Sequence, residues 1–295
     1  MFKKILYPTA FEEFSRDVLR CLTNFKSLGT EEIVLLHVIY ASQLPQVHEG
    51  YVLRLADALR HILNAKMDEA AGIVEGAGIK VKKRIELGVP HREILRVAQE
   101  EKASLIAAGR ERKGFLGEIF VGSITDKIVR HGTTPVYIPK YPGIYGADPK
   151  ACEAFCRNPF RRILYPTDWS DCARRALDYV KQFRNAGVEE VIVAHVMDEK
   201  AMRLQPEEKF NEFQRIDKEK LAQVKAELEK EGFRVSTHLS VGNPRAELIG
   251  IAKTQDVSLI VLGSHGKGRA EGILWGSVSR NVAEYSNRPT LVVRG

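Results

Sequence analysis

The sequence predicts an α/β protein made of two copies of one unit, each a parallel sheet with helices on both faces. The segment Ile5-Leu-Tyr-Pro-Thr9 recurs as Ile163-Leu-Tyr-Pro-Thr167, 158 residues later. Short apolar runs typical of buried strands alternate with longer segments whose apolar residues recur every three or four positions. This alternation favours a parallel sheet, because each crossover helix returns the chain to the same end of the sheet.

Matching segments run through both copies. They are Gly29 with Gly187, His37-Val38 with His195-Val196, Gly88-Val-Pro90 with Gly242-Asn-Pro244, Ser104-Leu-Ile106 with Ser258-Leu-Ile260, and Gly122-Ser123 with Gly276-Ser277. We therefore expect a first domain over 1–140, a linker over 141–159 and a second domain over 160–295. The linker is rich in proline and glycine, which interrupt helices and strands.

The elements of the second copy follow from its pattern. Strands are expected over 162–165, 189–196, 234–239, 257–262 and 290–294, and helices after Ser170 and over 209–231, 244–253 and 278–285. Ser170 suits an N-cap, because its hydroxyl can accept a hydrogen bond from an amide of the first turn. Pro244 suits the first helical position, where its missing N–H leaves no helical bond unmade.

Composition narrows the function classes. With 44% hydrophobic and 28% charged residues, the chain is ordinary for a globular protein. The net charge is +7, but the basic residues are scattered among 38 acidic ones and no basic run is interleaved with aromatic residues, so no nucleic-acid partner is expected. No apolar stretch reaches the roughly 20 residues that span a bilayer, and no export signal is visible. We expect a cytoplasmic protein without a membrane partner.

Four cysteines are too few for a disulfide scaffold. Cys21 and Cys172 fall inside helical patterns and are expected to be core thiols. Cys152 and Cys156 stand in the linker without a nearby histidine, so we expect two unconnected thiols, with a redox pair or a shared metal half-site as the alternatives.

The clearest functional signal is Gly263-Ser-His-Gly266, followed after nine intervening residues by Gly276-Ser277. It stands between an expected strand and an expected helix, where backbone amides can bind an anion. It is not a Walker A loop, because Arg269 and Ala270 replace the required Lys and Ser/Thr. Pro166-Thr-Asp168 ends the first strand, and ligands of open parallel sheets lie where such strand ends meet. These two motifs together predict nucleotide binding. Asp168 would accept a hydrogen bond from ribose or adenine or, alternatively, cap the following helix.

These motifs together resemble the universal stress protein family. The resemblance implies an open, doubly wound, flavodoxin- or Rossmann-like sheet of five parallel strands in the order 3-2-1-4-5 in each copy, with ATP or AMP, with or without Mg²⁺, at the switch point. It implies adenine and ribose contacts from Pro166, Thr167, Asp168, Val196 and Leu262. It implies phosphate and ribose contacts from Gly263, Gly266, Gly276, Ser277, Val278 and Ser279.

The resemblance also implies pairing of final strands. Tyr137-Ile138 and Leu291-Val292 would then meet in an internal pseudo-dimer, alone or within a homo-oligomer. The first copy departs from the family pattern, since Ala10 replaces the aspartate and Arg112 the second glycine. If Gly266 has a positive φ, a side chain there adds about 1–2 kcal/mol of strain. We therefore expect nucleotide mainly in the second domain.

The expected function is a stress-response sensor or regulator without catalysis. His195 and His265 have no nucleophile or carboxylate at a recognisable catalytic spacing, and His195 is expected to be a core or strand-end residue. One alternative is slow ATP hydrolysis or autophosphorylation, with Ser277 or Ser279 as the acceptor and Asp168 helping to hold the metal. The other is a partner-binding module that takes no nucleotide.

Overall fold

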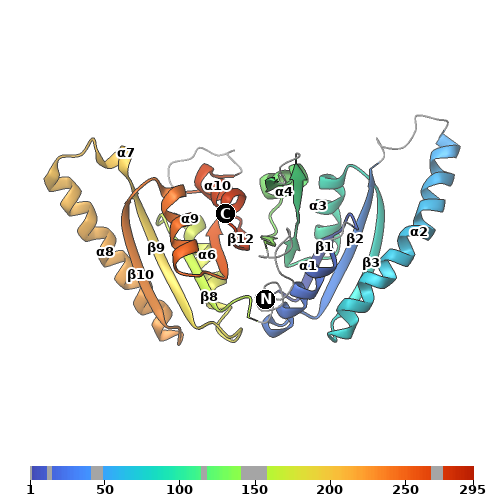
Figure 1. Cartoon of the computed structure of the whole chain (residues 1–295), viewed down its shortest axis with the longest axis horizontal. Helices are drawn as coiled ribbons and strands as arrows, with labels where there is room; N and C mark the ends of the chain where they lie inside the picture. The colour runs from blue at the N-terminus through green and yellow to red at the C-terminus, as the bar shows by residue number, and fades with distance from the viewer. Residues whose placement is uncertain (1, 12–14, 41–48, 114–117, 141–157, 267–274) are drawn as a thin grey trace. The chain divides into compact units, whose positions relative to one another are not determined.

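The computed structural model describes residues 2–11, 15–40, 49–113, 118–140, 158–266 and 275–295, without the side chains of 15, 49–60, 110–113 and 118–120. The chain divides into two compact units, Met1–Gly117 with Val121–Pro139 and Glu118–Phe120 with Lys140–Gly295. Figure 1 shows that each unit is a sheet with helices packed against it.

Each unit has five parallel strands. In the second unit the order is β10-β9-β8-β11-β12, with β8 Arg162–Pro166, β9 Glu190–Asp198, β10 Val235–Gly242, β11 Leu259–Gly263 and β12 Thr290–Val293. In the first unit it is β3-β2-β1-β4-β7, with β1 Lys4–Pro8, β2 Glu32–Tyr40, β3 Lys80–Gly88, β4 Leu105–Ala107 and β7 Val136–Ile138. Both orders read 3-2-1-4-5, so the predicted fold class is confirmed.

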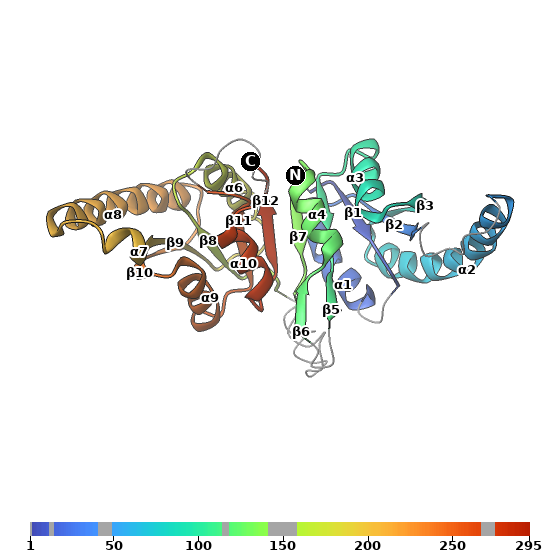
Figure 2. The same cartoon turned by 90° about the horizontal axis from the view of Figure 1, so that it is seen from above.

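Helices cover both faces of each sheet. Those of the second unit are α6 Asp171–Lys181, α7 Glu199–Met202, α8 Glu207–Lys230, α9 Pro244–Thr254 and α10 Ser277–Tyr285. Figure 2 shows α6 and α8 on one face of this sheet and α9 and α10 on the other. The first unit carries α1 Ser15–Leu22, a 3₁₀ helix Thr23–Leu28, α2 Glu49–Gly76, α3 Pro90–Glu100 and α4 Ser123–His131. Within the described residues, no helix combines the length and apolar character that crossing a bilayer requires.

The expected helix starts are found. The Ser170 hydroxyl caps α6 by accepting from the amide of Ala173 at 3.2 Å. The Asn243 side chain caps α9 by accepting from the amide of Ala246, also at 3.2 Å, and Pro244 follows as the first helical residue. Because β11 is buried along its whole length, helices on both faces fix where its carboxyl end lies.

Some local structure was not expected. Two short strands, β5 Arg110–Lys113 and β6 Glu118–Val121, occupy much of the segment in which a glycine loop was expected for the first copy. The run Ile119-Phe-Val121 favours a strand over a glycine-type loop, since branched and aromatic residues suit extended backbone. The single-turn helix α7 was also missed; the Asp198 side chain starts it by accepting from the amide of Lys200 at 2.9 Å.

The two described cysteines differ in state. Cys172 is buried and free, as expected. Cys21 is buried but disulfide-bonded, so the expectation of a core thiol there is wrong. A helical pattern locates a cysteine on a buried face, but it does not reveal what lies beside the sulfur. Cys152 and Cys156 lie outside the described residues.

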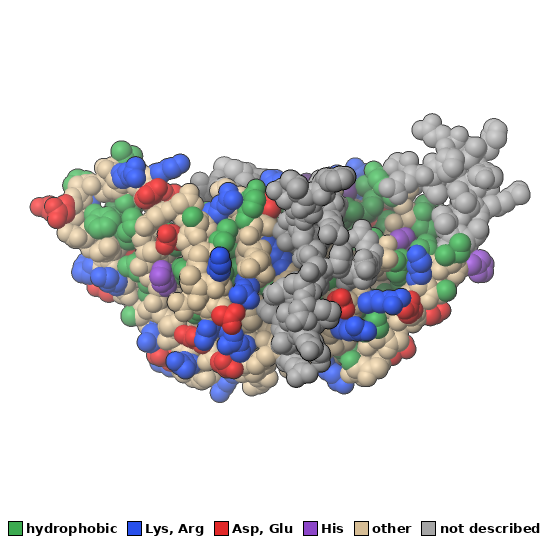
Figure 3. Space-filling view, in the orientation of Figure 1, with side chains coloured by type: hydrophobic (Ala, Val, Ile, Leu, Met, Phe, Trp, Pro, Cys, Tyr) green, Lys and Arg blue, Asp and Glu red, His purple; other side chains and the backbone are tan. Residues whose placement is uncertain are grey.

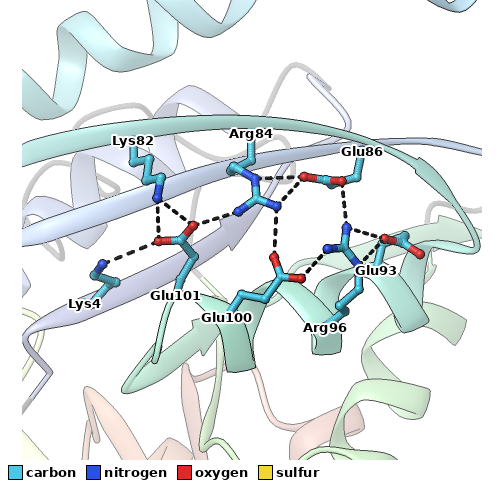
Figure 4. Close-up of polar contacts among 8 residues, drawn as sticks. All are labelled: Lys4, Lys82, Arg84, Glu86, Glu93, Arg96, Glu100 and Glu101. Carbon is cyan, nitrogen blue, oxygen red and sulfur yellow. Dashed lines mark hydrogen bonds and ion pairs between the residues drawn. The ribbon is translucent and has the colours of Figure 1, made fainter.

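The first unit is tied together by a network of eight charged side chains between β1, β3 and α3 (Figure 4). At one end the carboxylate of Glu101, only 5% exposed, meets Lys82 and Arg84 at 2.8 Å each and Lys4 at 3.5 Å. Hydrogen bonding from Lys82, together with Arg84 and Lys4, holds the pKa of the Glu101 carboxyl below its usual value. In the second copy, Gln255 occupies the position of Glu101 and Ser236 that of Lys82.

A close approach of backbone fixes α6 against β11 in the second unit. A Cβ on Gly263 would lie 2.8 Å from the sulfur of Cys172, 2.9 Å from its carbonyl carbon and 3.0 Å from the nitrogen of Ala173. Two of these three atoms belong to the backbone and cannot rotate aside. Glycine at 263 therefore lets the first turn of α6 pack directly on the strand end.

Substitution Glu101→Gln is expected to lower the free energy of unfolding by about 2 kcal/mol at neutral pH, because Lys82 and Arg84 lose a buried carboxylate partner. The pKa of Glu101 is lowered on folding, so its contribution is complete above the pKa of the unfolded chain and is lost as the pH falls through the folded-state pKa. Urea unfolding should therefore show wild type losing stability below about pH 4 more steeply than the variant. Glu31→Gln, which removes an exposed pair with Lys3, serves as the control; an equal loss in both variants would contradict the prediction.

Substitution Gly263→Ala is expected to destabilise the second unit by about 1–3 kcal/mol, because the added methyl group has no space against α6. The matched control is Gly250→Ala within α9, where nothing lies within 4 Å of the added Cβ. That change should stabilise the protein by about 0.5–1 kcal/mol through helix propensity. Thermal and urea unfolding measure both; destabilisation of the same size at the two positions would refute the packing argument.

Candidate functional site

A pocket of about 390 Å³ opens at the carboxyl ends of β8 and β11 in the second unit. These strands are neighbours in the sheet, and the chain leaves them toward helices on opposite faces, which is the switch point of a doubly wound fold. The volume lies within the range of roughly 300–1,000 Å³ usual for small-molecule sites. The pocket can therefore hold a ligand the size of a nucleotide.

The structure brings together every residue predicted for the site. Lining the pocket are Pro166, Thr167, Asp168, Val196, Leu262, Gly263, Gly266, Gly276, Ser277, Val278 and Ser279. They come from four separate segments of the sequence, which the topology brings to one edge of the sheet.

Six further residues line the pocket without having been predicted. They are Ala173, Ala194, Asp198, Pro244, Leu248 and His265. Ala194 and Asp198 flank Val196 at a spacing of two, so strand alternation places all three on one face of β9. Pro244 and Leu248 are four residues apart on α9 and share a helical face. Both spacings can be read from the sequence once Val196 and the segment Gly242-Asn-Pro244 are assigned to the wall of the pocket.

Asp168 is half-buried and held by its neighbour. Its Oδ1 accepts hydrogen bonds from the Ser170 amide at 3.1 Å and the Ser170 hydroxyl at 2.6 Å. The N-cap of α6 is Ser170 itself, so the alternative role of Asp168 as the cap of this helix does not apply. With Oδ1 engaged in this way, the carboxylate keeps one orientation at the pocket wall.

Gly266 packs against that carboxylate. A Cβ on Gly266 would lie 2.1 Å from Oδ2 of Asp168. The backbone of Gly266 is not in the left-handed region, so the expected strain from a positive φ does not arise there. Glycine is needed for space beside Asp168, which sequence spacing could not show.

The anion end of the pocket is the start of α10. Gly276 is the N-cap and offers no side chain to cap the helix, and its own amide donates to the Ser264 carbonyl at 2.7 Å. Amides of a first helical turn have no acceptor within the helix. Together with the dipole of the helix, they make this end of the pocket attractive to negative charge.

Ser279 has a defined structural partner. Its hydroxyl donates to the Gly263 carbonyl at 2.7 Å, linking α10 to the end of β11. Thr125 makes the same bond to Gly109 in the first unit, also at 2.7 Å. Because its proton is committed to this bond, Ser279 is free to serve a ligand only as an acceptor.

Tyr165 and Thr167, at the end of β8, are buried. The Tyr165 hydroxyl donates to the Ala173 carbonyl at 2.8 Å, and burial raises the pKa of Tyr165 to about 12. Thr167 is buried, and its carbonyl meets Nδ1 of His195 at 2.8 Å. His195 lies inside β9, which continues to Asp198, on the side of the strand opposite Val196.

The first unit repeats part of this architecture. Gly122 is the N-cap of α4 without a side-chain cap, as Gly276 is for α10. Ala10 stands where the second unit has Asp168, so this acceptor is missing. The side chain of Arg112 lies outside what the structure describes.

The described residues offer few side chains that could together bind a metal ion. Within the described parts of the chain, no group of three or more His, Cys, Asp or Glu side chains is arranged to hold a metal ion. Asp168 and Asp198 both line the pocket, so a divalent cation there would rely mainly on oxygen atoms of the ligand.

The model of the universal stress protein family matches this chain twice, over residues 1–140 and 159–294. A universal stress protein of Methanocaldococcus jannaschii is 38% identical over 154 residues, which cover 46% of this chain and 95% of the relative. One of Mycolicibacterium smegmatis is 22% identical over 273 residues, covering 91% of this chain and 89% of its own length.

A solved structure has a similar fold over the whole length. The crystal structure of a universal stress protein from Archaeoglobus fulgidus aligns with a TM-score of 0.73 and 27% identity, covering 99% of this chain and 96% of the other. With its two α/β units matched separately by the family model, the chain belongs to the universal stress protein family and carries two such domains in tandem.

Proposed function

We propose that the second domain binds one adenine nucleotide, ATP or AMP, and that the bound nucleotide makes the protein a sensor or regulator in a stress response. The observation that carries the proposal is the meeting, in one pocket, of apolar walls, an oriented carboxylate and a helix start without a side-chain cap. A purine, a ribose and a phosphate require these three environments respectively.

The base and sugar fit the part of the pocket nearest β8 and β9. Val196 and Leu262 supply apolar surface for a purine ring. Oδ2 of Asp168 is the oxygen not bonded to Ser170, and it can accept from a ribose hydroxyl or an exocyclic amine. This orientation of the carboxylate favours a nucleoside over an uncharged apolar ligand.

The phosphates fit the start of α10. The amides beyond Gly276 and the Ser277 hydroxyl provide donors at the positive end of a helix. Mg²⁺, when present, would arrive with ATP on its phosphate oxygens. Figure 3 shows basic and acidic side chains intermingled on the face drawn, without a large patch of one charge on the described residues.

Slow hydrolysis or autophosphorylation is a second possible activity of the same site. Ser277 or Ser279 would accept the phosphoryl group; in the structure the Ser279 hydroxyl donates to the Gly263 carbonyl. Mg²⁺-dependent release of ADP that disappears in Asp168→Ala would establish this activity. A protein that releases and binds no nucleotide would instead be a partner-binding module.

Purified wild-type protein is expected to release one adenine nucleotide per chain, detected by mass spectrometry, and to bind ATP or AMP in calorimetry. Asp168→Ala should weaken binding about 10- to 100-fold, because a polar group of the ligand loses its acceptor. Gly266→Arg should abolish it, since the new side chain displaces the Asp168 carboxylate and enters the pocket.

The matched control for Gly266→Arg is Gly250→Arg, which adds the same side chain at an open position of α9. It should bind like wild type. If wild type neither releases nucleotide nor gives heat with ATP or AMP, the proposal is wrong.

The first domain is expected to bind nucleotide much more weakly, because Ala10 offers no carboxylate. The double change Ala10→Asp with Arg112→Gly should create a second binding site. Calorimetry on a protein that also carries Gly266→Arg measures this new site alone, because the second domain then binds no nucleotide. Equal affinity of both domains in the wild-type protein would show that the aspartate does not distinguish them.

A further inference from the structure

Behind the pocket, three side chains form a cluster that the proposed contacts leave unused. The indole N–H of Trp169 donates to Oδ1 of Asp217 at 2.8 Å, and Nε2 of His195 lies 3.3 Å from Oδ2 of the same carboxylate. The rings of Trp169 and His195 pack with their centroids 4.9 Å apart. We name Trp169, His195 and Asp217 the Trp169 cluster. It joins α8 to the ends of β8 and β9.

The cluster stabilises an unfavourable backbone conformation beside Asp168. Trp169 has a φ of +66°, which costs a bulky L-residue free energy and persists only where surrounding contacts enforce it. Its amide donates to the Thr167 hydroxyl at 3.2 Å, closing a tight turn around Asp168. Whatever fixes the indole therefore fixes the direction of the neighbouring carboxylate.

His195 bridges two acceptors. Its Nδ1 faces the Thr167 carbonyl at 2.8 Å, while its Nε2 faces the Asp217 carboxylate. A neutral imidazole carries one proton, and only the imidazolium can donate in both directions. Lys220 of α8 adds a positive charge beside the cluster, with its nitrogen 5.6 Å from the centre of the Trp169 ring.

The first unit has the same turn but no aspartate at the position of Asp217. Phe11, with a φ of +58°, packs on His37 at 5.0 Å, and Nδ1 of His37 faces the Thr9 carbonyl at 2.8 Å. Leu63 occupies the position of Asp217. Burial, with the charge of Lys66, lowers the pKa of His37. The domain that lacks the pocket aspartate thus also lacks the indole N–H and the carboxylate that receives it.

We propose that the Trp169 cluster positions Thr167 and Asp168 for the nucleotide, so that His195 in its imidazolium form and Asp217 set the affinity of the second domain. The inference rests on the proposed function and adds a regulation to it: the site binds more tightly when His195 is protonated. These are positioning residues, since none of the three lines the pocket.

The test is calorimetric titration of ATP into the full-length protein between about pH 5 and pH 8, the range in which a histidine titrates. Asp217→Leu and Trp169→Phe each introduce the residue found in the first domain. Each should weaken binding about tenfold at the acidic end, and the loss in Asp217→Leu should shrink as the pH rises. The protonation of ATP itself cancels in the ratio of wild type to variant.

The variant Asp217→Asn removes the negative charge of this side chain while keeping its size and its hydrogen bonds. Its amide oxygen can accept from Trp169 and its amide nitrogen can donate to a neutral His195. Affinity at the alkaline end should therefore stay near wild type, while the pH dependence specific to wild type disappears. Glu219→Gln on the same helix, where the carboxylate meets only Arg215 in an exposed pair, controls for charge and should change nothing.

The outcomes are distinguishable. If wild type binds ATP and Asp217→Leu, folded by circular dichroism, binds equally well at every pH, the inference is overturned and the proposed function stands. If Asp217→Asn retains the wild-type pH dependence, the protonation of His195 is not its source and the inference is also wrong. Absence of ATP and AMP binding by wild type would overturn both.

Discussion

Two places without room for a side chain organise the second domain. Backbone of α6 meets Gly263 at the end of β11, and the Asp168 carboxylate meets Gly266 three residues later. The first contact sets how closely a helix start can approach a strand end, and the second sets where the loop passes. Gly263, Ala173, Gly266 and Asp168 all line the pocket, so both contacts help to shape its wall.

Much of this arrangement was predictable because the sequence contains it twice. A repeat fixes which apolar runs are strands, and the order 3-2-1-4-5 followed from the family resemblance. The predicted contacts converge because strand ends of a parallel sheet share an edge. What the sequence could not show depends on distances between segments: the contact of Gly266 with Asp168 and the bonding state of Cys21.

The two domains use one framework with different chemistry. In both domains a hydroxyl of the last helix donates to the carbonyl of the glycine at the end of the fourth strand. Both also have an aromatic residue with a positive φ shortly after the first strand. In the first domain, the charged network lies between β3 and α3, where the Glu101 carboxylate contacts Lys82 and Arg84. In the second domain, Asp168 lies at the pocket and Asp217 lies behind it. The framework therefore tolerates relocation of its buried charges without a change of topology.

The contact between Gly266 and Asp168 also constrains which substitutions the second domain can accept. While an aspartate stands at this turn, any Cβ at the glycine position collides with its carboxylate. Alanine at this turn has no carboxylate to collide with, and the first domain combines Ala10 with Arg112 at the two corresponding positions. Positions 168 and 266 of the second domain are thus coupled, because a side chain at 266 needs the space that the Asp168 carboxylate occupies.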